Sequence, residues 1–169
     1  MFETYIRSAI RKLVPIPIKV NCGERFIYWN DGIHEVINYT IDEKHPELAK
    51  EFSDYIEQKY NIDMKKYYFT FCLLHEIGHY YTKTEVDIET ENVLRQLIKM
   101  DENSSNAAYF ELPSEQLANE FAYQFFKLYP RDVNYFQRKV VPVIYYYGKH
   151  YQSNHYIQVK GNLCYEVNN

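Results

Sequence analysis

The chain has 169 residues, which is long enough for one domain with a sizeable hydrophobic core. Hydrophobic side chains make up 46% of it, with 19 Tyr and 10 Phe, and this composition excludes a disordered protein. The formal net charge of −4 provides no basic surface of the kind that binds nucleic acid, so we expect no direct nucleic-acid binding.

The N-terminal part predicts one helix followed by a small sheet. Apolar residues recur at helical spacing in residues 1–14, and Pro15 and Pro17 end that amphipathic helix. Three β-favouring stretches follow, and the Asn-Asp-Gly sequence at 30–32 is typical of a tight turn. We expect these stretches to pair as a small antiparallel sheet; they span residues 18–20, 26–29 and 36–41.

Two helices are predicted next. Pro46 opens a helix that ends near Asn61 and places Leu48 on its buried face. Asp63 is then placed to cap a second helix, which contains the apolar run Tyr67–Tyr81. This second helix carries the most informative residues of the chain.

The sequence His-Glu-Ile-Gly-His at 75–79 is an H-E-x-x-H motif, which is typical of zinc peptidases. Histidines four residues apart project from one face of a helix, so the imidazoles of His75 and His79 can converge on one tetrahedral ion. Glu76 lies beside them, where it is better placed to take a proton from a water at the metal than to bind the ion. We therefore expect one zinc ion (Zn2+) per chain, with Glu76 as the general base. The alternative to metal binding is that hydrogen bonds alone offset the free-energy cost of burying these three polar side chains.

The next elements lie in the second half of the chain. Residues 89–100 predict a helix, and a polar loop at 101–106 is a candidate lid or a tolerated insertion. Another helix begins at Ser114, and beyond Pro130 a short helix is followed by the run 140–147, which Pro142 interrupts. The helix at 89–100 has an apolar cluster made of Val93, Leu94, Leu97 and Ile98.

A catalytic zinc site needs a third protein ligand, and Glu115 is the best candidate. It shares one face of its helix with Ala118, Asn119 and Ala122. The small alanines would let this helix lie close to the H-E-x-x-H helix, while the Asn119 amide would support a ligand from behind. The alternative is that Glu115 is only a first-turn acidic residue favoured by the helix dipole.

Two other glutamates are weaker candidates for the third ligand. Glu120 points about 140° away from Glu115 on the helix. Glu111 precedes Pro113 and lies outside the predicted helix. We therefore expect the carboxylate of Glu115 to reach the metal.

The H-E-x-x-H motif at 75–79, followed by E-x-x-A-N-x-F-A at 115–122, resembles the ImmA/IrrE family of gluzincin-type metallopeptidases. The second motif carries most of the resemblance, because many zinc peptidases share the first. The resemblance extends over roughly residues 20–128. It implies that His75, His79 and Glu115 are the zinc ligands. It also implies that Glu76 is the general base and that Asn119 is the residue that supports a ligand.

For function, the resemblance implies an intracellular zinc endopeptidase that hydrolyses a peptide bond in a regulatory protein. The expected partner is a DNA-binding, helix-turn-helix repressor of a phage or mobile element, and no membrane partner is expected. The alternative is a catalytically silent, peptidase-like binding module that sequesters a protein partner, with zinc serving structure. The complete motif favours the enzyme, because a purely structural site does not need Glu76.

A zinc peptidase also needs a group that stabilises the oxyanion. A His or Tyr side chain can supply it, and His150, His155 and Tyr146 are candidates because they follow the ligand helix. An isolated His or Tyr is more often a surface or packing residue, which is the alternative for each of the three.

Together these patterns predict an α+β fold: a mostly helical, minimal gluzincin-like metallopeptidase domain with a small antiparallel sheet near the N-terminal side of the active-site helix. We expect a single domain over 1–169, with the helix 1–14, a core at 18–128 that contains the zinc site, and a C-terminal extension at 130–169. Three widely spaced cysteines favour a reducing compartment. Charged residues among the first dozen positions leave no uncharged apolar segment of the kind that an export signal needs. A cytoplasmic protein is therefore expected, and a secreted protease is disfavoured.

Overall fold

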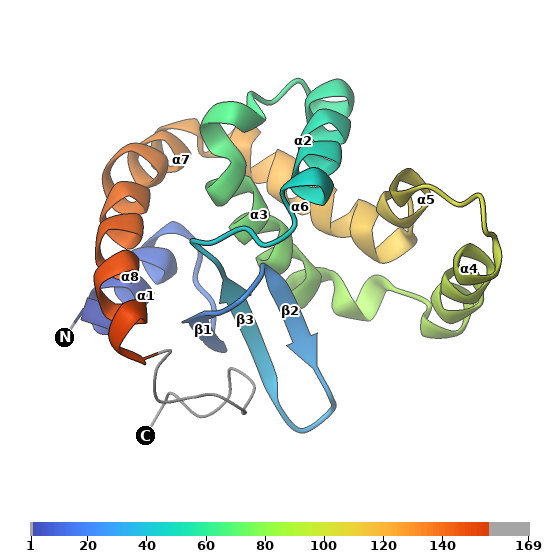
Figure 1. The fold of residues 1–169 in the computed structure, drawn as a ribbon, viewed down its shortest axis with the longest axis horizontal. Helices are drawn as coiled ribbons and strands as arrows, with labels where there is room; N and C mark the ends of the chain where they lie inside the picture. Colours follow the sequence, from blue (N-terminus) through green and yellow to red (C-terminus); the bar gives the residue numbers. More distant parts are fainter. Residues whose placement is uncertain (1, 156–169) are drawn as a thin grey trace. The chain divides into compact units, whose positions relative to one another are not determined.

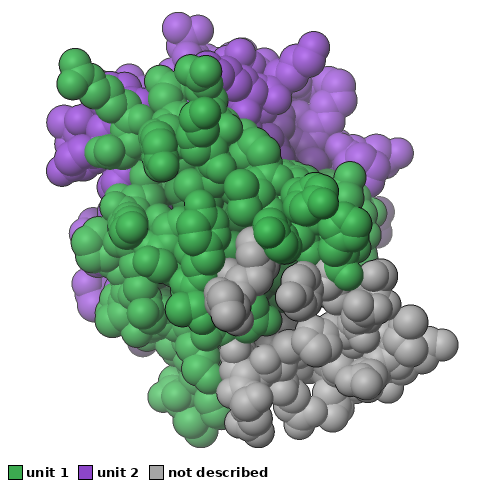
Figure 2. All heavy atoms as spheres, turned by 90° about the vertical axis from the view of Figure 1, so that its left-hand side faces the viewer, with its two compact units in different colours: residues 1–44, 131–169 green, residues 45–130 purple. Residues whose placement is uncertain are grey.

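The computed structural model describes residues 2–155, which are mostly helical with one three-stranded sheet (Figure 1). This confirms the predicted α+β, mostly helical class. The chain divides into two compact units, coloured separately in Figure 2: residues 1–44 with 131–169, and residues 45–130. The first unit thus combines segments from both ends of the sequence, whereas the second is continuous. None of the helices in the described part is both long enough and apolar enough to span a bilayer.

The sheet of the first unit is mixed, so the prediction of an antiparallel sheet was only half right. Its strands are β1 (Lys19–Cys22), β2 (Ile27–Asn30) and β3 (Glu35–Tyr39), in the order β1-β3-β2. β2 and β3 form an antiparallel hairpin whose turn contains Gly32 with φ of 85°, whereas β1 runs parallel to β3. Four of the five residues of β3 are buried, which explains why this strand takes the centre, with a partner on each side.

The helices of the first unit come from both ends of the chain. They are α1 (Phe2–Leu13), α7 (Pro130–Tyr135), the π-helical turn η2 (Phe136–Val140) and α8 (Val141–His155). Residues 140–147, whose secondary structure could not be assigned from the sequence, are therefore helical despite Pro142. Proline has no N–H for the usual helical hydrogen bond to the carbonyl four residues earlier. The wider turn η2 directly precedes α8, and there the Val141 N–H donates to the Phe136 carbonyl.

The second unit consists of helices. They are α2 (Pro46–Tyr60), α3 (Met64–Thr82), the short 3₁₀ turn η1 (Lys83–Glu85), α4 (Ile88–Met100), α5 (Asn106–Phe110) and α6 (Pro113–Leu128). As predicted, α2 stops at Asn61, which has a left-handed φ of 54°, and the Asp63 side chain caps α3 by accepting the Lys66 N–H at 3.1 Å. The sequence did not predict α5, which begins at the last residue of the expected polar loop.

Some apolar residues on these helices face solvent, and for Leu48 this contradicts the predicted buried face. Leu48 on α2 is 44% exposed, and Val93 and Leu97 on α4 are more than half exposed. On α4 the buried position belongs to a charged residue, Glu91. Polar contacts of Glu91 therefore decide which face of α4 is buried. A search of the sequence for apolar residues does not detect such contacts.

The most extensive contact between helices of the second unit lies between α3 and α6, which pack against each other (Figure 1). Ala118 and Ala122 of α6 are fully buried. A Cβ atom built on Gly78 of α3 would lie 2.9 Å from the carbonyl oxygen of Ala118 and 3.0 Å from its Cα. The two helices therefore approach to a distance that only a glycine at position 78 allows.

We predict that Gly78→Ala destabilises the protein. Alanine favours a helix interior over glycine by about 1 kcal/mol, but the new methyl group would overlap backbone atoms of α6, which no side-chain rotation can relieve. We expect a net loss of about 1–3 kcal/mol in the free energy of unfolding, measured by urea denaturation without added metal.

The double variant Gly78→Ala/Ala118→Gly is the matched control. Because the clashing atoms of Ala118 belong to its backbone, removal of its methyl group should not restore stability. A Gly78→Ala protein that is as stable as the wild type would contradict the close helix packing.

Candidate metal centre

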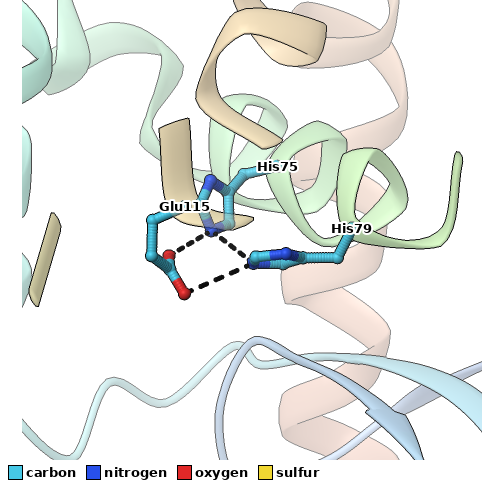
Figure 3. A group of neighbouring side chains, drawn as sticks. All are labelled: His75, His79 and Glu115. Carbon is cyan, nitrogen blue, oxygen red and sulfur yellow. Dashed lines mark hydrogen bonds and ion pairs between the residues drawn. The ribbon is translucent and has the colours of Figure 1, made fainter. Parts of the chain in front are cut away.

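The three predicted ligands lie together in the second unit. Figure 3 shows His75 and His79 projecting from α3 toward Glu115, which comes from α6. His75 Nε2 is 3.1 Å from His79 Nε2 and 3.1 Å from Glu115 Oε2, and His79 Nε2 is 3.6 Å from Glu115 Oε1. One ligand atom from each residue can be chosen so that all lie within 4.8 Å of one another. Helix α3 alone cannot make this cluster; it needs α6 at close range.

The separations between these atoms fit a zinc ion. For a tetrahedral ion with Zn–N and Zn–O bonds of about 2.0–2.1 Å, neighbouring ligand atoms stand about 3.4 Å apart. The two imidazole nitrogens are 3.1 Å apart, and they lie 3.1 and 3.6 Å from the two different oxygens of Glu115, which is close to that value. Two imidazoles and one carboxylate are also a ligand set of catalytic zinc sites, which keep a fourth position for water or substrate. The donor chemistry and the geometry therefore both fit zinc.

The electrostatics of the cluster favour a positive charge among the three side chains. Burial alone would lower the pKa of His75, but the hydrogen bond with Glu115 and the negative charges of Glu76 and Glu115 outweigh it and raise this pKa to about 8. Burial would likewise raise the pKa of Glu115, yet the hydrogen bonds from His75 and His79 hold it well below its usual value. A cation between the imidazoles and the carboxylate meets the same electrostatic demand as the proton does.

Asn119 holds His75 from the other side of its ring. It is fully buried on α6, and the Nδ1–H of His75 donates to its Oδ1 at 2.8 Å. Loss of the Nε2 proton to a metal ion would leave the neutral imidazole with its proton on Nδ1 and its lone pair on Nε2, the nitrogen that faces His79 and Glu115. This is the tautomer that a metal ligand requires. The hydrogen bond from His75 Nδ1–H is also the contact through which Asn119 is predicted to support this ligand.

Glu76 lies in the same buried region but outside the ligand group. Only 9% of its surface is exposed, and its charge contributes to the raised pKa of His75. The cluster of candidate ligand atoms contains His75, His79 and Glu115 without it. This placement fits a proton acceptor beside the metal better than a metal ligand.

The other candidates for the third ligand are engaged elsewhere. Glu120 is exposed and accepts a hydrogen bond from Gln124 Nε2 at 2.6 Å. Glu111 is also exposed, and it accepts a hydrogen bond from the Tyr55 hydroxyl. Both therefore belong to the surface of the second unit.

The candidates for the oxyanion role lie in the first unit. Tyr146 and His150 are exposed on α8, where their rings pack with centroids 4.9 Å apart. His155 is the last residue of α8, and its side chain lies outside the described residues. The oxyanion role of these three residues stays a prediction.

Sequence reasoning missed three residues that surround the centre. Phe52 of α2 packs edge-on against the His75 ring, with centroids 5.5 Å apart. Glu91 and Arg95 of α4 form an ion pair at 3.0 Å, and Arg95 Nη2 lies 3.9 Å from Glu115 Oε1. The signal in the sequence was an i,i+4 Glu/Arg pair on a helix, which is indistinguishable from an ordinary surface pair.

Comparisons with protein-family models, curated proteins and solved structures found no match to this chain.

We predict that the purified protein holds about one zinc ion per chain, bound by His75, His79 and Glu115. Glu115→Ala should lose the metal, because two imidazoles alone leave the ion without its carboxylate ligand. Glu120→Ala, which removes an exposed glutamate of the same helix, should keep it. Elemental analysis of both variants tests this, and zinc retained in Glu115→Ala but lost in Glu120→Ala would reverse the assignment.

We also predict that Asn119→Ala weakens zinc binding by about 10–100-fold, as loss of a residue that orients a ligand histidine commonly does. Asn119→Asp preserves an acceptor for His75 Nδ1–H and should bind zinc more tightly than the alanine variant. Competition with a chromogenic chelator measures both constants. Equal weakening in the two variants would argue against hydrogen bonding as the reason for the effect.

Proposed function

We propose that this chain is a zinc-dependent endopeptidase of the ImmA/IrrE type that hydrolyses a peptide bond in a protein substrate. The single observation that supports this most is the convergence of His75, His79 and Glu115, from two helices, beside the buried carboxylate of Glu76. A ligand set of two histidines and one carboxylate with an adjacent glutamate is the arrangement that metal-assisted peptide hydrolysis uses.

A bound zinc ion would supply Lewis acidity, which polarises the scissile carbonyl and lowers the pKa of the attacking water toward about 7. Glu76 accepts the proton of that water and then delivers it to the nitrogen of the leaving amine. Glu76 is 9% exposed, so its carboxylate lies in the same buried region as the two histidines. Asn119 keeps the Nε2 lone pair of His75 directed toward His79 and Glu115 throughout.

The centre supports catalysis better than a structural metal site. Structural zinc sites are closed by four protein ligands, usually cysteines and histidines, whereas three protein ligands gather in the described part of this centre. A structural site also gives no reason to bury an additional carboxylate next to two histidines, since that burial costs free energy. Both features follow directly from a hydrolytic role.

The resemblance to the ImmA/IrrE family supports a substrate class as well. We propose a DNA-binding, helix-turn-helix repressor of a phage or mobile element, which would place the enzyme in the cytoplasm. The three cysteines of the sequence are widely spaced and odd in number, which favours a reducing compartment.

We predict that Glu76→Gln abolishes hydrolysis and preserves zinc binding. Gln is nearly isosteric with Glu but cannot accept the proton, so the rate should fall by at least about 10²-fold. The substrate is a proteome-derived peptide library, with cleavage sites identified by mass spectrometry. Cleavage by the wild type should also stop when zinc is chelated and return when zinc is restored.

Glu120→Gln is the matched control, because it neutralises an exposed glutamate and should leave cleavage unchanged. Proteins that Glu76→Gln retains from a cell lysate can then be incubated with the wild type, and a repressor among those that are cut would support the substrate class. Retained partners that the zinc-loaded wild type never cuts, together with no cleavage of the library, would instead favour the sequestering module.

A further inference from the structure

A buried charged residue links α4 to the start of the ligand helix. Glu91 is 5% exposed, although it is a carboxylate on a helix whose apolar residues Val93 and Leu97 face solvent. Its Oε2 accepts the backbone N–H of Ser114 at 3.3 Å, and its Oε1 accepts the Ser114 hydroxyl. Because Ser114 directly precedes Glu115, these bonds hold the backbone next to a metal ligand.

Glu91 also supplies what the N-terminus of α6 lacks. The N-cap residue of α6 is Leu112, which has no side chain able to accept a hydrogen bond from the first turn. The first-turn N–H groups of a helix have no intrahelical partners and carry a partial positive charge. The carboxylate of Glu91 provides this acceptor from another helix, so the position of α6 is coupled to that of α4.

Arg95 lies one turn beyond Glu91 on α4 and is held on several sides. Its Nη2 donates to Glu91 Oε1 at 3.0 Å, and its Nη1 donates to the Tyr109 hydroxyl at 3.1 Å. The guanidinium also stacks over the Tyr109 ring, 5.1 Å from the centroid. A planar guanidinium cannot rotate without breaking one of these contacts, so its orientation is fixed.

The same Nη2 atom faces the metal ligand. It lies 3.9 Å from Oε1 of Glu115, the oxygen that is 3.6 Å from His79 Nε2. The second oxygen, Oε2, is the one that is 3.1 Å from His75 Nε2. A carboxylate that binds a metal through one oxygen leaves the other oxygen for an outer partner, and such partners orient the ligand.

We infer that Arg95 is a positioning residue for Glu115, and that Glu91 and Tyr109 hold Arg95 in place. This inference rests on the metal site of the proposed function and adds a second layer to it. Arg95 restricts rotation of the Glu115 carboxylate, so that Oε2 stays directed at His75 and Oε1 at His79. It also balances the negative charges that Glu91 and Glu115 bring into the same buried region. Arg95 acts through Glu115 and has no direct part in the chemistry.

The test measures the metal site itself rather than turnover. Zinc affinity is obtained by chelator competition, and the visible spectrum of the Co2+-loaded protein reports the ligand geometry. Arg95→Gln should bind zinc about 10–100-fold more weakly and shift the Co2+ bands. Lys99→Gln is the matched control, since it removes a positive charge from an exposed position one turn further along α4 and should change neither readout.

Two further variants separate positioning from charge and from folding. Arg95→Lys keeps the charge but cannot bond Glu91 and Tyr109 together, so it should also weaken zinc binding and shift the bands. Tyr109→Phe removes one hydroxyl from a ring that is 42% exposed, a change that the fold tolerates, and should weaken zinc binding by about 2–10-fold.

The outcomes distinguish this inference from the proposed function. If Arg95→Lys and Tyr109→Phe bind zinc as the wild type does and share its Co2+ spectrum, the positioning role is overturned while the zinc site stands. If the wild type binds neither metal, the proposed function and the role of Arg95 are overturned together. Circular dichroism of each variant confirms that weakened binding does not come from unfolding.

Discussion

The close approach of α3 and α6 is the constraint on which the rest of the centre depends. Two histidines on one helix can offer only two ligands, and the third must come from a helix that lies nearly in backbone contact. Gly78 and Ala118 make that contact possible by presenting almost no side-chain volume between the two helices. The arrangement of the three candidate ligands is therefore set by backbone packing, which is stiffer than any loop that could carry one of them.

Burial of charge is the cost of this arrangement. Glu76, Glu91 and Glu115 are each less than a tenth exposed, so three carboxylates share the interior of one small helical unit. The unit compensates with hydrogen bonds and with the guanidinium of Arg95, and a divalent cation would complete the balance. The same carboxylates that make the unit costly to fold favour a positive charge among them, as the raised pKa of His75 indicates.

The sequence predicted the parts of the centre that follow from helical periodicity. Residues 75, 79 and 115 could be identified because a motif fixes the first two and a stripe of small residues fixes the face that carries the third. The parallel pairing of β1 with β3 and the link from Glu91 to Ser114 could not, because each joins segments whose contact depends on tertiary packing. The prediction that Leu48 is buried was wrong for the same reason: an apolar stripe predicts burial only where a partner surface exists.

The division of the chain into two units also affects the order in which the parts of the protein fold during synthesis. Every residue of the metal centre lies in the continuous segment 45–130, whereas the unit that holds the sheet needs residues 1–44 together with residues from 131 onward. Compact units fold as wholes, and the ribosome releases the chain from its N-terminus. The helices that carry His75, His79 and Glu115 can therefore pack together before α7 and α8 are synthesised, so the unit that contains residues 1–44 is completed after the unit that contains residues 45–130.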